Sequence, residues 1–179
     1  MRCPPDGAER KGNREITVQK GEKTVAISQQ QLPVIGWREH VVLPELGISQ
    51  VKAKIDTGAR SSALHAFDIE TFQDDGKMMV RFKVHPYQRD THRTVLAQAE
   101  LIDQREVRNS GGHAQWRPVI QTTVQLGEFV FPIELTLTSR DKMGFRMLLG
   151  RQAVRRRFLV DAGQSFLQSR TGSNKRQQA

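Results

Sequence analysis

The residues most suited to chemistry are Asp56, Thr57, Gly58 and Ala59, which follow an alternating apolar run that ends at Ile55. A carboxylate can take a proton from water, but a single one is a weak base at neutral pH because carboxylic acids ionise near roughly pH 4. Two carboxylates about 3 Å apart share one proton, so one acts as a base while the other donates to a carbonyl oxygen. The chain has one Asp-Thr-Gly, so the second acid would come from a two-fold related copy of the chain.

The residues beside the acid suit such a pairing. The Thr57 hydroxyl can form a hydrogen bond across the two-fold axis. Gly58 has no Cβ atom, so its N–H can point at the carboxylate and a second backbone can come close. The tripeptide by itself is short enough to occur by chance, and its position at the end of a strand makes it more specific.

Other kinds of site have weaker support. The histidines are scattered without a His-Glu-x-x-His pair, so a metal hydrolase stays open only as a less favoured alternative. Ser61 and Ser62 lack the Gly-x-Ser-x-Gly elbow of a serine hydrolase. The sequence has no Walker phosphate loop and no Gly-rich dinucleotide fingerprint, and we expect neither a cofactor nor a metal. The histidines are His40, His65, His85, His92 and His113.

The elements that position Asp56 are predicted to be strands. Residues 51–55 alternate between apolar and lysine side chains, which is the two-residue period of a half-buried strand. An Asp-Gly pair at 75–76, flanked by apolar runs, predicts a hairpin. Only residues 150–158 favour a helix, of about two turns. Short turns roughly every ten residues therefore predict a closed or sandwiched all-β domain.

Two stretches, KIDTGARSSALHA (54–66) and MLLGRQAVRRRFLVDAG (147–163), resemble the paired signatures of retropepsin-like aspartic proteases. Together with VRNSGGHAQWRPVI (107–120) and ELTLTSRDKMGFRMLLGR (134–151), they resemble a bacterial family labelled ATP-dependent zinc protease and associated with the RimK-type glutamate ligase. The resemblance covers about residues 34–167. Because the sequence has neither a phosphate loop nor a zinc constellation, we take the aspartic-protease signature as the chemistry.

The composition of the two ends leaves residues 32–169 as the folded domain, and the resemblance implies that this domain is a retropepsin-like closed β-barrel with one short helix near the C-terminus. It implies an aspartic endopeptidase that works as a homodimer, with Asp56 as the catalytic acid. The residues implied to support the active site are Thr57, Gly58, Ala59, Gly150 and Arg151, and the segment 148–151 is implied to pack beneath the Asp56 turn.

Arginines dominate the predicted substrate site. Arg60 departs from the retroviral pattern, which has an acid there, and arginines suit a substrate with several carboxylates. The family association indicates the oligo-glutamate tail that the ligase adds to a small-subunit ribosomal protein. The alternative is that these arginines form surface or structural ion pairs. The predicted substrate-binding residues are Arg60, His65, Gly111, Gly112, His113, Arg117 and Arg140, with Arg108 in support.

Residues 105–118 predict a hairpin with Gly111 and Gly112 at its tip. In retropepsins a glycine-tipped hairpin closes over the substrate and excludes water. His113 and Trp116 would then lie beside the bound chain. The alternative is an ordinary surface hairpin with Trp116 in the core.

The ends of the chain differ from the rest in composition. Residues 1–31 and 170–179 are rich in Gly, Ser, Gln, Lys and Arg, and they carry more than half of the net charge of +9. We expect mobile basic tails that either attract polyanions weakly, without specific nucleic-acid recognition, or only keep the chain in solution. No run approaches the roughly 18 apolar residues of a membrane helix, and the first residues lack a signal-peptide core, so we expect a cytoplasmic protein.

Two functions from different classes follow. The first is peptide-bond hydrolysis by a carboxylate pair, acting on a glutamate-rich peptide. The second is a non-catalytic binding module that modulates a RimK-type ligase or binds the ribosome. Cleavage of a glutamate-tailed peptide, measured with and without the ligase, would separate them.

Overall fold

The computed structural model describes residues 32–88, 90–108, 112, 114–139 and 144–169. The predicted tails at 1–31 and 170–179 lie outside the described residues. Three predicted substrate-binding residues, Gly111, His113 and Arg140, also lie outside them. In the described part of the chain, no helix is long and apolar enough to cross a membrane.

The described residues form strands joined by short turns, with one short α-helix and one 3-10 helix among them. In chain order the elements are β1 (Val34–Gly36), β2 (Arg38–Leu43), η1 (Pro44–Leu46), β3 (Ile48–Asp56), β4 (Ser62–His65), β5 (Phe67–Asp74), β6 (Lys77–Val84), β7 (Val95–Arg108), β8 (Ala114–Leu126), β9 (Phe129–Thr138), β10 (Met147–Gly150), α1 (Arg151–Val154) and β11 (Leu159–Asp161).

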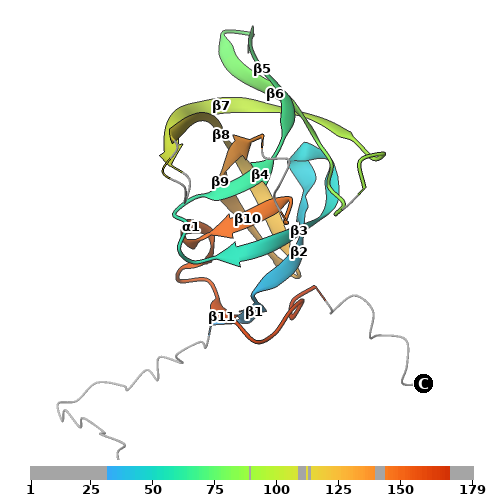
Figure 1. Cartoon of the computed structure of the whole chain (residues 1–179), viewed down its shortest axis with the longest axis vertical. Coiled ribbons are helices and arrows are strands. Elements are labelled where there is room, and N and C mark those ends of the chain that lie inside the picture. The colour runs from blue at the N-terminus through green and yellow to red at the C-terminus, as the bar shows by residue number, and fades with distance from the viewer. Residues whose placement is uncertain (1–31, 89, 109–111, 113, 140–143, 170–179) are drawn as a thin grey trace, which may run out of the picture. The chain divides into compact units, whose positions relative to one another are not determined.

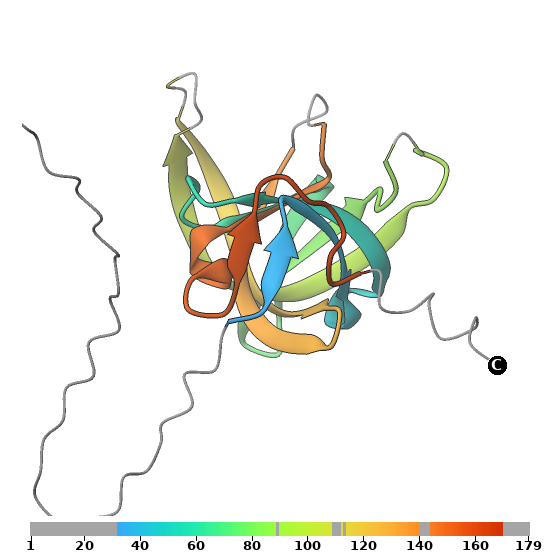
Figure 2. The same cartoon turned by 90° about the horizontal axis from the view of Figure 1, so that it is seen from below.

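The main sheet closes on itself. Strands β2, β3, β10, β4, β9 and β8 are hydrogen-bonded in that order, and β2 also pairs with β8 through Val42 and Gln125 (Figure 1). Strands β7, β6 and β5 extend the sheet from β8, and β1 and β11 form a separate parallel pair, seen side by side in Figure 2. The predicted all-β, retropepsin-like closed fold with one short helix near the C-terminus is confirmed.

The core follows the alternating pattern of the strands. In β3, Val51, Ala53 and Ile55 are buried, while the lysines between them lie on the other face. In β6, Val80 and Phe82 are fully buried. Burial of each large apolar side chain contributes about 1.5–3 kcal/mol relative to exposure. The core side of β3 therefore fixes which face of the strand carries Asp56.

The hairpin between β5 and β6 forms at the predicted Asp-Gly pair. Asp75 and Gly76 both have positive φ, at 45° and 76°. Two consecutive residues with positive φ match the twist of the flanking strands in a two-residue turn. This turn lets Asp74 pair with Lys77 directly across the hairpin.

The helix is shorter than predicted. The segment 150–158 was expected to form about two turns, whereas α1 ends at Val154. Arg155 is extended and Arg156 has a φ of 62°, so the chain reverses at this point. The reversal brings Phe158 into the core, where its ring lies 5.2 Å from that of Phe129. Burial of Phe158 thus overrides the helix propensity of the arginines.

A buried carboxylate ties the C-terminal segment to β2. Glu39 is 0% exposed, and its Oε1 accepts hydrogen bonds from the N–H groups of Gly36 and Leu167, both at 2.8 Å. Its Oε2 accepts from the Ser169 hydroxyl at 2.8 Å. A buried charge needs such partners, because an unpaired one is costly. Glu39 therefore fixes the path of residues 167–169.

We expect Glu39→Ala to lower the free energy of unfolding by about 2–3 kcal/mol, because the buried N–H of Gly36 would lose its acceptor. Urea unfolding at neutral pH measures the change. Glu100→Ala is the matched control, since Glu100 forms an exposed pair with Lys77 that contributes at most about 0.5 kcal/mol. Equal losses in the two variants would contradict the anchoring role of Glu39.

Glu45 joins η1 to β8. Its Oε1 accepts a hydrogen bond from the Thr123 hydroxyl at 2.6 Å, and its Oε2 accepts from the Thr123 N–H at 3.0 Å and the Thr122 hydroxyl at 3.1 Å. These bonds, the Thr123 hydroxyl first, hold the pKa of Glu45 below its usual value. A carboxyl group with a lowered folded-state pKa stabilises the fold above its unfolded pKa, and this contribution is lost as the pH falls through the folded pKa.

The stability of the protein should therefore decline from roughly pH 5 downward, and Glu45→Gln should make that decline shallower. Urea unfolding at a series of pH values, with parent and variant side by side, measures both slopes. The variant should be less stable than the parent at neutral pH, and the two should converge in acid. Parallel curves over the whole range would show that Glu45 does not contribute to the acid response.

Candidate active site

Asp56 is the last residue of β3, and its side chain is half-buried. Its Oδ1 atom accepts hydrogen bonds from the N–H groups of Gly58 at 3.1 Å and Ala59 at 3.0 Å. Among the described residues, none donates a hydrogen bond to Oδ2. The turn thus fixes the orientation of the carboxylate through one oxygen and leaves the other for a water, a substrate or a second carboxyl group.

Strand β10 supports this turn from one side. β10 runs parallel to β3, and the register places Gly150 opposite Asp56. Directly after β10, the N–H of Arg151 donates to the carbonyl oxygen of Ala59 at 2.8 Å, and the N–H of Gln152 donates to that of Arg60 at 3.1 Å. These bonds join the start of α1 to the Asp56 turn, so the two segments are positioned together.

The Arg151 side chain holds the tip of the same turn. Its Nη1 donates to the carbonyl oxygens of Thr57 at 3.1 Å and Gly58 at 3.5 Å. Backbone carbonyls at a tight turn otherwise depend on water for their hydrogen bonds. The guanidinium therefore acts on the turn as a structural support, and the structure brings together the predicted support residues around Asp56.

Gly150 allows the close approach of β10 to the chain after the turn. A Cβ atom at Gly150 would lie 2.4 Å from the carbonyl oxygen of Ser61 and 2.9 Å from the N–H nitrogen of Ser62. Its own N–H donates to the Ser62 hydroxyl at 3.1 Å, and the carbonyl of Ser62 accepts from the Thr136 hydroxyl at 2.9 Å. Ser62 and Thr136 are thus buried polar residues that hold the site in place.

The sequence reasoning did not assign these two residues. Ser62 was considered only as a nucleophile, and Thr136 looks like any other β-branched strand residue. Their role depends on pairing between β4 and β9, which are separated by more than sixty positions in the chain. The role of Trp37 also has no signal in the sequence. Its carbonyl oxygen accepts a hydrogen bond from the N–H of Ile55 at 2.9 Å, just before the Asp56 turn.

The predicted substrate-binding residues fall into two groups. Arg60 and Gly112 are exposed, and Trp116 on the β7–β8 hairpin is 67% exposed, which excludes the alternative of a core position. The hairpin itself forms as predicted, with Arg108 paired to Ala114 at its end. Exposed residues next to Asp56 or on this hairpin are available to a bound chain.

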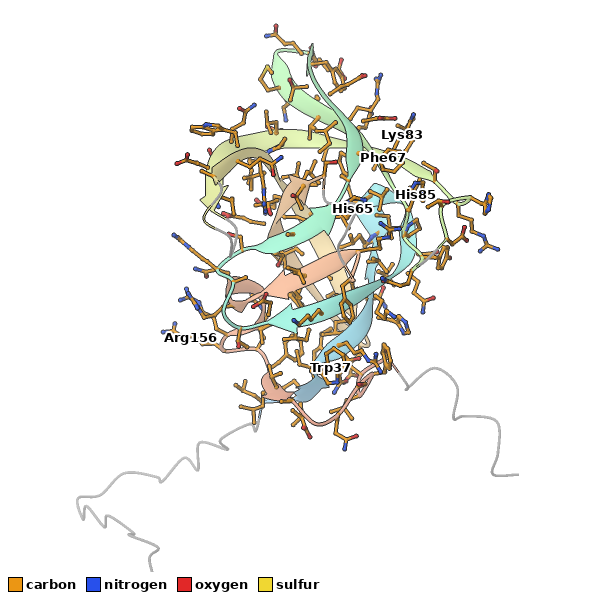
Figure 3. All side chains as sticks on the ribbon, in the orientation of Figure 1. Trp37, His65, Phe67, Lys83, His85 and Arg156 are labelled. Carbon is orange, nitrogen blue, oxygen red and sulfur yellow. The ribbon has the colours of Figure 1, made fainter. Side chains whose placement is uncertain are left out.

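His65 and Arg117 are buried instead. His65 is 2% exposed at the end of β4, and it pairs with Thr138 (Figure 3). Arg117 lies on β8, two residues before the buried Val119, and is 6% exposed. The strand register places His65 four residues from the level of Asp56, roughly 13 Å along the sheet. Direct contact of His65 or Arg117 with a substrate at Asp56 stays a prediction.

The side chains that could bind a metal ion are dispersed over the residues that the structure describes. In the described parts of the chain, no group of three or more His, Cys, Asp or Glu side chains is placed to hold a metal ion. The N–H groups of Gly58 and Ala59 donate to the Asp56 carboxylate, and the Arg151 guanidinium donates to the carbonyl oxygen of Thr57. The carboxylate is therefore held by hydrogen bonds.

The closed sheet, the Asp-Thr-Gly turn at the end of β3 and the Leu-Leu-Gly-Arg segment beneath it define a retropepsin-like protein. Residues 34–171 match the RimB-like family, described as retropepsin-like aspartic endopeptidase RimB. The chain belongs to this family. The resemblance that the sequence motifs indicated is thereby confirmed.

Relatives and a solved structure agree with this assignment. The chain is 48% identical over 128 residues to a probable alpha-L-glutamate ligase of Desulfotalea psychrophila, covering 72% of this chain and 28% of that protein. It is 41% identical over 133 residues to a protein of the same name from Shewanella halifaxensis, covering 74% and 29%. The chain therefore spans less than a third of the length of these curated relatives.

A crystal structure of a Legionella pneumophila protein, Lpg0085, described as having unknown function, is similar in fold. Its TM-score is 0.62 at 27% sequence identity, and the match covers 76% of this chain and 98% of that one. The shared fold therefore extends over nearly the whole of the Legionella protein.

We expect Gly150→Ala to lower the free energy of unfolding by about 1–3 kcal/mol, because its Cβ would press on backbone atoms that cannot rotate away. Thermal or urea unfolding measures the loss. Gly144→Ala is the control, since a Cβ at Gly144 meets nothing within 4 Å among the described atoms. A Gly150→Ala protein as stable as the Gly144→Ala protein would refute the close packing of β10 on the turn.

Proposed function

We propose that the protein is an aspartic endopeptidase whose active site pairs Asp56 of two copies of the chain. The observation that carries the proposal is the Asp56 turn, in which two backbone N–H groups fix Oδ1 and none of the described residues donates to Oδ2. Membership of the RimB-like family supports the same chemistry. A single carboxylate in this position would be a weak base, so the pairing is part of the proposal.

The proposed reaction uses one shared proton. The ionised carboxylate takes a proton from a water, and the resulting hydroxide attacks the carbonyl carbon of the peptide bond. The other carboxyl group donates its proton to the carbonyl oxygen, which gives a tetrahedral intermediate. When the C–N bond breaks, the amine leaves with a proton from the first carboxyl group, and a hydroxyl group of the intermediate returns its proton to the second carboxylate. The products are a carboxylic acid and an amine, and the pair again holds one proton.

Gly58 supports the close approach of a second copy. Its φ is not in the left-handed region, and a Cβ there would meet only Oδ1 of Asp56, at 3.4 Å, which is an ordinary contact. The described part of one chain therefore gives no reason for a glycine at this position. A partner backbone that packs on the turn supplies such a reason, since a Cβ would stand between the two copies.

A glutamate-rich peptide is the proposed substrate. Arg60 follows the catalytic turn directly and is exposed, and a guanidinium binds carboxylates through paired N–H donors. The curated relatives are named probable alpha-L-glutamate ligases, so a domain like this one occurs in proteins named for joining glutamate. Hydrolysis of a glutamate-bearing chain is the reverse of the reaction that joins glutamate to it.

The same relatives favour a second candidate, a non-catalytic module that modulates a glutamate ligase. In them the matched region is only 28–29% of a protein named as a ligase. A domain in that position could act by binding the ligase or its product. In this second candidate, Asp56 would have a structural role only, which the following experiment tests.

Asp56→Asn should leave the fold intact and reduce cleavage of a glutamate-tailed peptide by roughly 10²–10⁴-fold, because asparagine cannot exchange a proton with water. Mass spectrometry of the products measures cleavage, and circular dichroism checks the fold. A variant that cleaves as well as the parent would overturn the mechanism. If neither protein cleaves but a RimK-type ligase changes its rate when the parent is added, the binding module is correct.

Mixing the two proteins tests the pairing. A mixed dimer contains only one Asp56 carboxylate. An excess of the Asp56→Asn chain should therefore reduce the measured activity below that of the same amount of parent protein alone. Thr71→Val in the same excess is the control, since Thr71 lies on β5 in the sheet extension and this chain keeps Asp56, so it should add activity in proportion to its amount. If the parent keeps its full activity in the excess of the Asp56→Asn chain, each chain works alone and the shared-proton site is wrong.

A further inference from the structure

A group of exposed arginines lies beside the catalytic turn. Arg60 follows the turn, Arg151 begins α1, and Arg155, Arg156 and Arg157 follow α1 directly. All five are exposed, and Figure 3 shows Arg156 at the edge of the molecule next to α1. We call these five residues the arginine surface.

The arginine surface carries charge that no carboxylate of the described residues neutralises. No ion pair joins any of its five guanidinium groups to a carboxylate of the described residues. Glu134 lies close by, yet its Oε2 is bound to Arg105 at 2.6 Å. Like charges gathered without counter-charges destabilise a fold slightly, so their position suits an anionic ligand.

The arginine surface is fixed relative to Asp56. The hydrogen bonds from Arg151 and Gln152 to the carbonyls of Ala59 and Arg60 join α1 to the turn. The guanidinium of Arg157 lies 5.1 Å from the centre of the Phe131 ring. A ligand that contacts these residues is therefore held in a set position relative to the catalytic carboxylate.

Two hollows connect the arginine surface to the turn. The first, of about 250 Å³, is lined in part by Arg60, Ser61, Gln152 and Arg157. The second, of about 490 Å³ and more open, is lined by Gln152, Arg155, Arg156 and Arg157. Because Gln152 and Arg157 line both, the two hollows adjoin, and together their linings form a path from Arg60 to the arginines that follow α1.

We propose that this path is a docking site for the acidic part of the substrate that extends beyond the peptide bond being cut. This inference rests on the proposed function, and it states which part of the substrate the protein binds outside the site of cleavage. Arginine forks match carboxylates in pairs, and several spaced along a path match a repeated acidic side chain. Length of the glutamate tail, rather than the residues at the cut alone, then sets the affinity.

The surface favours an acidic peptide over a nucleic acid. Proteins that bind single-stranded nucleic acid combine basic grooves with exposed aromatic rings on which bases stack. Here the aromatic rings next to the arginines, Phe131 and Phe158, are buried at 8% and 5% exposure. The first hollow also includes Ile133 and Ala153, which suit the methylene groups of a glutamate side chain.

The test uses Arg155→Gln combined with Arg156→Gln, two residues outside the catalytic turn. Binding of a fluorescent oligo-glutamate peptide is measured by anisotropy on an Asp56→Asn background, so that no cleavage is needed. We expect binding of a long tail to weaken roughly five- to tenfold, with less change for a short tail. In the catalytically intact protein, KM for the long tail should rise by a similar factor with kcat unchanged.

The matched control is Arg81→Gln combined with Arg93→Gln, which removes the same charge from exposed arginines that lie over Phe72 and Tyr87. It should leave binding within about twofold of the parent, since its long-range effect is screened by salt. An equal loss in both double variants would overturn the docking site, because net charge alone would explain it.

Two further outcomes separate the docking site from the peptidase proposal. If the parent binds the long tail through these arginines but never cleaves it, the docking site stands and the peptidase proposal fails. If the parent cleaves long and short tails equally well, the docking site fails and the peptidase proposal stands. Tighter binding of a single-stranded RNA of equal length, lost in the same double variant, would also overturn the docking site in favour of nucleic acid.

Discussion

The site depends on the contact between the Asp56 turn and the chain that leaves β10. Parallel pairing of β3 with β10 sets Gly150 opposite Asp56, and the absence of a Cβ at Gly150 lets the backbone after the turn lie against it. The N–H and guanidinium groups of Arg151 then satisfy carbonyls of the turn on two sides. The orientation of the Asp56 turn is therefore set by a second strand as well as by β3 itself.

Local signals predicted much of the fold. The alternation in 51–55 and the Asp-Gly pair at 75–76 both depend on neighbours in sequence, and the structure has a strand at the first and a turn at the second. The helix predicted at 150–158 is longer than the observed α1, because burial of Phe158 opposes the local helix propensity. That burial depends on residues far away in the sequence. The pairing of β2 with β8 through Val42 and Gln125, which closes the sheet, has no local signal in the sequence.

The same distinction applies to the site. Asp56, Gly150 and Arg151 stand in recognisable motifs, so their positions could be predicted. Ser62 and Thr136 act through bonds between distant strands, and Glu39 is a buried acid that resembles a surface residue in sequence. A polar residue in an alternating strand gives no sign of whether its face is covered until the pairing of the strands is known.

The arginines around the turn differ in the hydrogen-bond and ion-pair partners that they have among the described residues. The guanidinium of Arg151 donates to carbonyl oxygens of the turn, so it is less available to a ligand. Arg60 and the arginines after α1 have no carboxylate partner among the described residues. The left-handed backbone of Arg156 comes from the reversal that buries Phe158, and that reversal also leaves Arg155 and Arg157 exposed. The packing that ends α1 at Val154 therefore also leaves these arginines exposed close to the Asp56 turn.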